Sequence, residues 1–125
     1  RAKTRFAHGS LLSEKGEIQA YIAESAAEIQ AARLMTLDAA RAMDEGDEAR
    51  IEIALIKFWG ARMLHNVVDR AIQVHGGLGL TSDTPLEFMY REARYARIYD
   101  GPDEVHRMTV ARRLLKDPSN GTPWA

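Results

Sequence analysis

The chain has 125 residues, with 17 Lys and Arg against 18 Asp and Glu, and no cysteine. A net charge of −1 gives no electrostatic reason to expect a nucleic-acid partner, and the lack of cysteine excludes disulfides and thiolate metal sites. No apolar run has the length needed to span a membrane, and no signal peptide is recognisable. We therefore expect a soluble intracellular domain, cytoplasmic or, in a eukaryote, mitochondrial.

Two long stretches carry apolar residues at spacings of three and four, which predicts two long helices. The first covers Glu17–Glu45 and has Gly46 to end it. The second covers Glu48–His75, with Asp47 as its N-cap. The second helix is apolar over a wide arc, so we expect it at the centre of the fold. The short connection makes the two helices antiparallel neighbours.

Proline marks two shorter helices. Pro85 suits the first turn of a helix over Thr84–Arg94, and Pro102 precedes one over Asp103–Leu115. Residues 1–15 show no helical period and are predicted as a loop, and no segment of the chain is predicted as a strand. The elements together predict an all-α fold, an antiparallel up-and-down bundle. We expect one domain over residues 1–118 and a flexible tail over residues 119–125.

Two stretches carry candidate chemistry. Gly76-Gly77-Leu78-Gly79 follows the second helix, where glycine is common as a cap, but glycines also let a backbone approach a cofactor closely. This is not the dinucleotide-binding fingerprint, because a helix and not a strand precedes it. Asp100 stands before Gly101 and Pro102 and, taken alone, is typical of a turn. It also lies just before a helix start, where unpaired backbone amides favour a carboxylate near a polar group.

The remaining charged residues have simpler interpretations. Six arginines near the C-terminus are predicted to form a solvated face, balanced by four acids: Arg91, Arg94, Arg97, Arg107, Arg112 and Arg113 against Glu87, Glu92, Asp103 and Glu104. The four histidines show no metal-ligand spacing on one helix face, so we interpret them as structural and predict no metal site.

Four motifs, in order and spacing, resemble the C-terminal region of the acyl-CoA dehydrogenases. Gln73–Gly79 resembles their Q-x-x-G-G-x-G segment, and Ile98–Gly101 stands where the family has I-Y-E-G. Pro85–Glu87 with Arg91–Arg94 resembles Y-P-V-E and R-D-A-R, and Arg5–Gly9 resembles R-x-x-F-G. The resemblance covers nearly the whole chain. The wording D-G-P-D-E-V-H is most similar to a long-chain-type subgroup in which Asp is usual at the position of Asp100.

The resemblance implies an FAD-dependent enzyme that dehydrogenates an acyl-CoA thioester at its α and β carbons. It implies two further domains ahead of this one, electron transfer flavoprotein as the acceptor, and a homodimer or homotetramer. Asp100 would be the catalytic base that removes the α-proton, and the β-hydrogen would leave as hydride to the flavin. The resemblance assigns FAD contacts, partly across a subunit interface, to Arg5, His8, Leu12, Gln73, Gly76, Gly77, Pro102 and Glu104.

Two alternatives stay open. A flavin oxidase of the acyl-CoA or nitroalkane type would also suit an Asp base. A helical assembly module with no chemistry of its own would explain the helices alone. The 125-residue chain by itself is expected to be inactive and, because its second helix is so broadly apolar, to self-associate.

Overall fold

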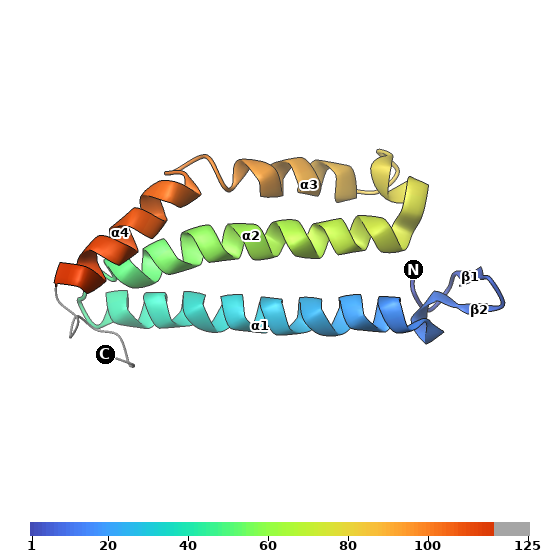
Figure 1. Ribbon diagram of the computed structural model, residues 1–125, viewed down its shortest axis with the longest axis horizontal. Coiled ribbons are helices and arrows are strands. Elements are labelled where there is room, and N and C mark those ends of the chain that lie inside the picture. Colours follow the sequence, from blue (N-terminus) through green and yellow to red (C-terminus); the bar gives the residue numbers. More distant parts are fainter. Residues whose placement is uncertain (117–125) are drawn as a thin grey trace.

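The computed structural model describes residues 1–116, so the predicted tail over residues 119–125 lies outside the described residues. Apart from a short hairpin near the N-terminus, all regular secondary structure of the described part is helical (Figure 1). This confirms the all-α prediction. The elements are β1 (Phe6–Ala7), β2 (Ser10–Leu11), a 3-10 helix (Leu12–Glu14), α1 (Gly16–Asp44), α2 (Arg50–His75), a second 3-10 helix (Gly76–Leu80), α3 (Leu86–Tyr95) and α4 (Asp103–Lys116).

The helix α2 is the centre of the fold, as its wide apolar arc predicts. It packs antiparallel to α1 on one side, while α3 and α4 pack against its other side (Figure 1). Most buried residues of the two long helices are small, which keeps neighbouring helix axes close. They are Ala32 and Ala39 on α1 and Ile51, Ala54, Ala61 and Val68 on α2.

The connection between α1 and α2 differs from the predicted N-cap. Gly46 has φ +90 and ends α1 in the left-handed conformation, as expected. The Asp47 carboxylate, however, accepts a hydrogen bond from the Ala49 N–H at 3.0 Å inside the connection. Ala49 itself has φ +47, so the helical backbone begins only at Arg50. The prediction that Asp47 caps α2 is therefore wrong.

An ion pair fixes the pairing of α1 with α2. The Arg70 guanidinium on α2 lies 2.8 Å from the Glu28 carboxylate and 3.1 Å from that of Glu24, both on α1. The hydrogen bond from Arg70 holds the pKa of Glu28 below its ordinary value. The bridge involves the second half of α2 and the first half of α1, as an antiparallel pair requires.

The N-terminal hairpin contradicts the prediction that no strand is present. Phe6 pairs with Leu11 and Ala7 with Ser10, across a two-residue turn. Both turn residues are left-handed, His8 with φ +50 and Gly9 with φ +83, the conformation that the favoured two-residue hairpin turns require. Strands of two residues are too short to show an alternating pattern, which is why the sequence did not predict them.

The two short helices lie close to their predicted bounds. The helix α3 begins at Leu86 with Pro85 as its N-cap residue, so Pro85 precedes the helix instead of lying in its first turn. Its Tyr90 ring packs edge-on against His65 of α2, with ring centroids 4.6 Å apart, which supports a structural role for that histidine. The helix α4 begins at Asp103 as predicted and ends one residue later, at Lys116.

Exposed apolar side chains gather on α1 more than on α2. Ile22, Ile29, Leu34, Leu37 and Met43 of α1 are each about half exposed, whereas α2 leaves only Ile53 and Leu64 more than a third exposed. The surplus apolar surface therefore lies mainly on a different helix from the one expected. Within residues 1–116 no helix is long and apolar enough to cross a membrane.

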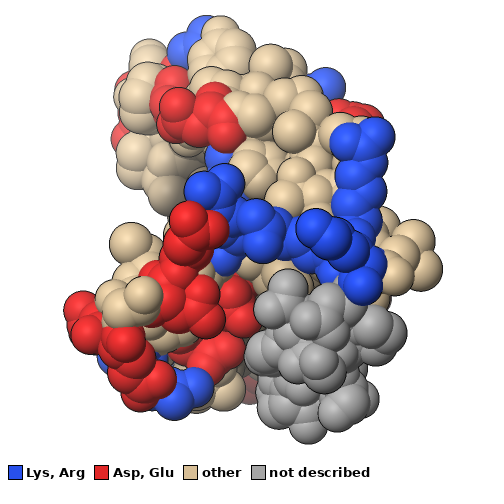
Figure 2. All heavy atoms as spheres, turned by 90° about the vertical axis from the view of Figure 1, so that its left-hand side faces the viewer, with Lys and Arg blue, Asp and Glu red and all other residues tan. Residues whose placement is uncertain are grey.

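Charges of both signs meet at one end of the molecule. Figure 2 views this end, with basic side chains above a group of acidic ones. The last turn of α4 contributes Arg113 and Lys116, and the α1–α2 connection contributes Asp47 and Glu48. The acidic group beside the basic one leaves this end without a uniformly basic face.

Candidate functional site

The predicted site residues fall into two groups at opposite ends of α2. Gln73, Gly76 and Gly77 lie at its C-terminal end, whereas the Asp100 turn lies beside Lys57. Residues 57 and 73 are roughly 24 Å apart along the helix axis at 1.5 Å per residue. Two groups this far apart could bind only different parts of a long ligand or different ligand molecules.

The first group forms a pocket of about 350 Å³ that we call the glycine pocket. It is lined by residues from the N-terminal segment and from the end of α2, including Arg1, Arg5, Leu12, Gln73, His75, Gly76 and Gly77. Five predicted cofactor residues are thus brought together. His8 is not among them, because the left-handed turn places it at the exposed tip of the hairpin.

The three glycines of the pocket region serve different purposes. Gly76 has φ +63 and ψ −147, a conformation that only glycine adopts readily, and it ends α2. Gly79 is buried, and a methyl group there would lie 3.0 Å from the Ile72 backbone. A methyl group on Gly77 would meet no atom within 4 Å. The chain's own fold therefore demands glycine at 76 and 79 but not at 77, where the backbone stays open to a ligand.

The donor set of the glycine pocket suits a phosphate-bearing cofactor. Within residues 1–116, the Arg5 guanidinium has no carboxylate within ion-pair distance and is exposed at the pocket. A planar guanidinium binds two phosphate oxygens at once. Gln73 adds an amide that can both donate and accept hydrogen bonds. The residues present thus fit the diphosphate and nucleoside part of FAD.

We expect Gly77→Ala and Gly79→Ala to separate binding from stability. Gly77→Ala should leave the free energy of unfolding within about 0.5 kcal/mol of the parent but weaken FAD binding by about tenfold or more, because its methyl group fills the open side of the pocket. Gly79→Ala should lower the free energy of unfolding by about 1–3 kcal/mol, because its methyl group overpacks Ile72. Denaturant unfolding and FAD titration of the full-length protein measure both. Parent-like FAD affinity in Gly77→Ala would contradict the assignment.

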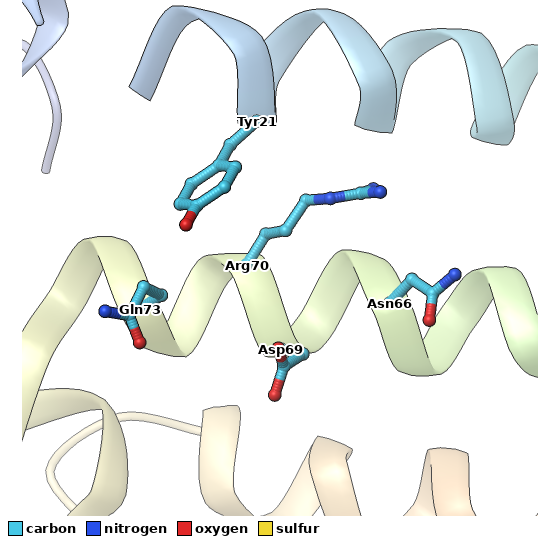
Figure 3. A pocket seen from close by; sticks show the side chains of 5 residues that line it. All are labelled: Tyr21, Asn66, Asp69, Arg70 and Gln73. Atoms are coloured by element: carbon cyan, nitrogen blue, oxygen red, sulfur yellow. The ribbon is translucent and has the colours of Figure 1, made fainter. Parts of the chain in front are cut away.

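A polar pocket next to the glycine pocket does not form a second site. It is lined by Tyr21, Asn66, Asp69, Arg70 and Gln73. Figure 3 shows Tyr21 and Arg70 between α1 and α2, while Asp69 points to the opposite side of α2. The Arg70 charge is already neutralised by two glutamates, and a hydrogen bond to Glu17 raises the pKa of Tyr21. The side chains do not converge on a common point.

The second group centres on the turn between α3 and α4. Asp100 has φ +52 and Gly101 has φ +96, so two consecutive residues are left-handed. Aspartate tolerates this conformation better than most residues, and it places the Asp100 side chain on the exposed surface of the turn. The following glycine is required for a second reason: a methyl group on Gly101 would lie 2.7 Å from the His106 ring nitrogen Nε2.

Pro102 and Glu104 follow Asp100 along the chain, at the start of α4. The Pro102 carbonyl accepts the N–H groups of Val105 and His106 and so begins α4. The Glu104 side chain is 77% exposed and lies 3.9 Å from Arg107. Both residues share the surface of the Asp100 turn, and neither lies on the glycine pocket.

Asp103 is the residue beside the Asp100 turn whose burial the sequence did not predict. Predicted on a solvated face, it is only 1% exposed. Its carboxylate accepts a hydrogen bond from Arg97 Nε at 2.9 Å, and its backbone N–H donates to the Arg97 carbonyl at 3.2 Å. These two bonds join both ends of the segment that carries Asp100. A sequence signal existed, since opposite charges at 97 and 103 bracket the Gly-Pro turn.

Comparison with known proteins identifies relatives over most of the chain. A family model described as acyl-CoA dehydrogenase, C-terminal domain, matches residues 1–115. Acyl-CoA dehydrogenase family member 10 of Mus musculus is 47% identical over 121 residues, which are 95% of this chain and 11% of the relative. Probable acyl-CoA dehydrogenase FadE2 of Mycobacterium tuberculosis is 46% identical over 117 residues, 92% of this chain and 29% of the relative.

The fold agrees with a solved structure of the same kind. The structure of butyryl-CoA dehydrogenase from Megasphaera elsdenii matches with a TM-score of 0.88 at 29% identity, covering 91% of this chain and 30% of that chain. The chain thus spans less than a third of the length of each of these three proteins. It belongs to the acyl-CoA dehydrogenase family and corresponds to the C-terminal helical domain of that family.

Proposed function

We propose that this chain is the C-terminal domain of an FAD-dependent acyl-CoA dehydrogenase, with Asp100 as the base that removes the α-proton of an acyl-CoA thioester. The observation that carries the proposal is the Asp100 turn. It presents an exposed carboxylate on a backbone held in an uncommon conformation, at the position where the family has its catalytic glutamate.

A carboxylate that acts as the general base must meet three requirements. It must reach the α-carbon, it must be ionised, and it must hold its position during proton transfer. The turn supplies the position, because the Asp100 carbonyl lies 3.1 Å from His106 Nε2 and the Gly101 carbonyl 3.2 Å from Lys57 Nζ. The Asp100 backbone N–H is a candidate donor to the thioester oxygen, which gains negative charge as the proton leaves.

Water exclusion would come from outside this chain. Asp100 is exposed here, and a general base works best in a site closed to solvent. The relatives are more than three times longer than the matched segment, so they have further domains able to cover the turn. When bound, FAD would accept the β-hydrogen as hydride.

The separation of the two groups suggests how FAD is shared. Arg5, Leu12, Gln73, Gly76 and Gly77 of the glycine pocket would hold the nucleotide end of an FAD molecule bound mainly by another copy of the protein. Pro102 and Glu104 would lie beside the flavin end of the FAD that serves Asp100 of the same copy. Electron transfer flavoprotein is the proposed electron acceptor, and a homodimer or homotetramer is the proposed assembly.

An anaerobic titration tests the proposed function. The full-length protein should purify yellow, and a saturated acyl-CoA should bleach its flavin in a stoichiometric manner. Fast reoxidation by oxygen, with consumption of oxygen during turnover, would favour the oxidase. A colourless protein that assembles but binds neither FAD nor acyl-CoA would favour the assembly module and contradict the proposal.

The isolated chain is expected to self-associate. Five apolar side chains of α1 are each about half exposed, and surplus apolar surface of this kind is typical of interfaces. Closed symmetric assemblies are the usual outcome. Light scattering at micromolar concentration should therefore give a mass at least twice the 14.0 kDa of one chain. A monodisperse monomer would count against the assembly, and Leu34→Ser with Leu37→Ser should shift the distribution toward monomer.

A further inference from the structure

The Lys57 ammonium on α2 joins the Asp100 turn to the body of the fold. Its Nζ donates to the Ala96 carbonyl at 2.7 Å and to the Gly101 carbonyl at 3.2 Å. The same Nζ lies 5.4 Å from the centroid of the Tyr99 ring, close enough for a cation–π contact. One half-buried cation thus contacts both ends and the middle of residues 96–101, a segment we call the Asp100 loop.

The Asp100 loop needs such an anchor. Left-handed backbone at Asp100 is disfavoured relative to ordinary turns, so the surrounding structure must hold it. Ala96 is buried at the start of the loop, but apolar packing supplies little support close to the turn, because Ile98 is 56% exposed and Tyr99 is 50% exposed. Charge-assisted hydrogen bonds to carbonyls are stronger than neutral ones, so Lys57 is well suited to the task.

The other bonds of the Asp100 loop cannot replace this anchor. The Arg97 side chain bonds to Asp103, and His106 lies against the Asp100 carbonyl, so these contacts stay within the loop and the start of α4. The backbone N–H groups of residues 96–99 donate to carbonyls near the end of α3 and not to α2. They set the shape of the turn. Among residues 1–116, the hydrogen bonds from Lys57 are the ones that connect this loop to α2. They tie the loop directly to the central helix.

We infer that Lys57 is a positioning residue for Asp100, an inference that rests on the proposed role of Asp100 as the base. Removing the ammonium frees both carbonyls, and the loop then samples positions that move the carboxylate by ångströms. A displacement of about 1 Å costs on the order of 10²-fold in rate. Lys57→Met, which keeps the length and the apolar part of the side chain, should therefore slow flavin reduction by acyl-CoA by about 10²-fold.

A double-mutant cycle in the full-length, FAD-loaded protein separates positioning from a general structural role. Flavin reduction is measured in the parent, Lys57→Met, Asp100→Asn and the double variant. If Lys57 acts through the Asp100 carboxylate, Lys57→Met should change the residual rate of Asp100→Asn by less than about threefold, because that background has no base left to position. Equal slowing in both backgrounds would show a general structural effect and overturn the inference.

The outcomes distinguish this inference from the proposed function. If Asp100→Asn is slow while Lys57→Met keeps the parent rate, the proposed function stands and the inference fails. If Asp100→Asn keeps the parent rate, Asp100 is not the base and both fail. Arg62→Met is the matched control, since Arg62 is an exposed cation on the same helix with no ion pair among the described residues, and it should keep the parent rate.

A readout independent of catalysis completes the test. Amide hydrogen exchange of residues 97–101 should speed up in Lys57→Met and stay at the parent value in Arg62→Met; unchanged exchange in Lys57→Met would overturn the inference.

If Lys57→Met fails to load FAD, Lys57→Arg replaces it in the cycle. Arginine keeps the charge but changes the donor geometry. It should slow the parent by about threefold or more and leave the Asp100→Asn background unchanged, and slowing in neither background would overturn the inference.

Discussion

Asp100→Asn should slow flavin reduction by acyl-CoA by about 10²–10⁴-fold in the full-length protein, the loss that is typical when a general base is removed. Asparagine adopts left-handed backbone as readily as aspartate, so the turn with φ +52 should keep its shape. An amide cannot accept the α-proton. FAD content and acyl-CoA affinity should change little, because the lost interaction belongs to the transition state. Stopped-flow absorbance of the flavin measures the effect.

Asp100→Glu is the informative companion. Glutamate is the usual family residue, but it is one methylene longer and tolerates the left-handed conformation less well than aspartate. If the turn is shaped around the shorter side chain, Asp100→Glu should also be impaired, by less than Asp100→Asn. A parent-like rate in Asp100→Asn would remove Asp100 from the mechanism and point to a base outside this chain.

Asp103→Ala should give the largest loss of stability, about 2–4 kcal/mol in the free energy of unfolding. The Asp103 side chain is only 2% exposed and pairs with Arg97, whose side chain is 32% exposed. Removing one member of a buried pair leaves the other charge without its partner, which costs about 3–5 kcal/mol when both are buried. Partial exposure of Arg97 reduces that figure. Denaturant unfolding monitored by circular dichroism measures it.

Glu104→Ala is the matched control for Asp103→Ala. It removes a neighbouring carboxylate from the same helix turn, but this side chain is 77% exposed. Exposed ion pairs contribute little, so the change should stay within about 0.5 kcal/mol. Equal losses for the two variants would show that the effect comes from the charge at the start of α4 and not from the buried pair.

The long helices were predictable because their signal repeats many times. Over α1 and α2, each turn adds another apolar residue on the same face, and the structure confirms both helices to within about two residues. The hairpin and the start of α2 were not predictable in this way. They depend on a left-handed backbone at two non-glycine residues, His8 in the hairpin turn and Ala49 before α2. Most non-glycine residues avoid this conformation, so the residue types at these positions gave no reason to expect it there.

The site was predictable only where a motif marks it. The Gln73–Gly77 segment and Arg5 do meet in one pocket, as the resemblance implied. Asp103 was predicted on a solvated face, which is wrong. Its burial arises from its pairing with Arg97 across the turn, and helix periodicity cannot predict such a pairing. Lys57 had a weak signal, a cation among apolar residues of α2, but its partners at 96 and 101 are backbone carbonyls. A contact to a backbone carbonyl does not depend on which side chain the partner residue carries, so the sequence does not reveal it.

The central claim is that the Asp100 carboxylate takes the α-proton, and exchange of that proton with solvent tests it most directly. An acyl-CoA with oxygen in place of the β-carbon cannot lose a β-hydride, so its α-hydrogens report proton removal alone. Incubated in deuterium oxide with the full-length, FAD-loaded protein, this thioester should gain deuterium at the α-carbon. If Asp100 is the base, Asp100→Asn should lower the exchange rate by at least about 10²-fold. Exchange at the parent rate in Asp100→Asn would contradict the claim.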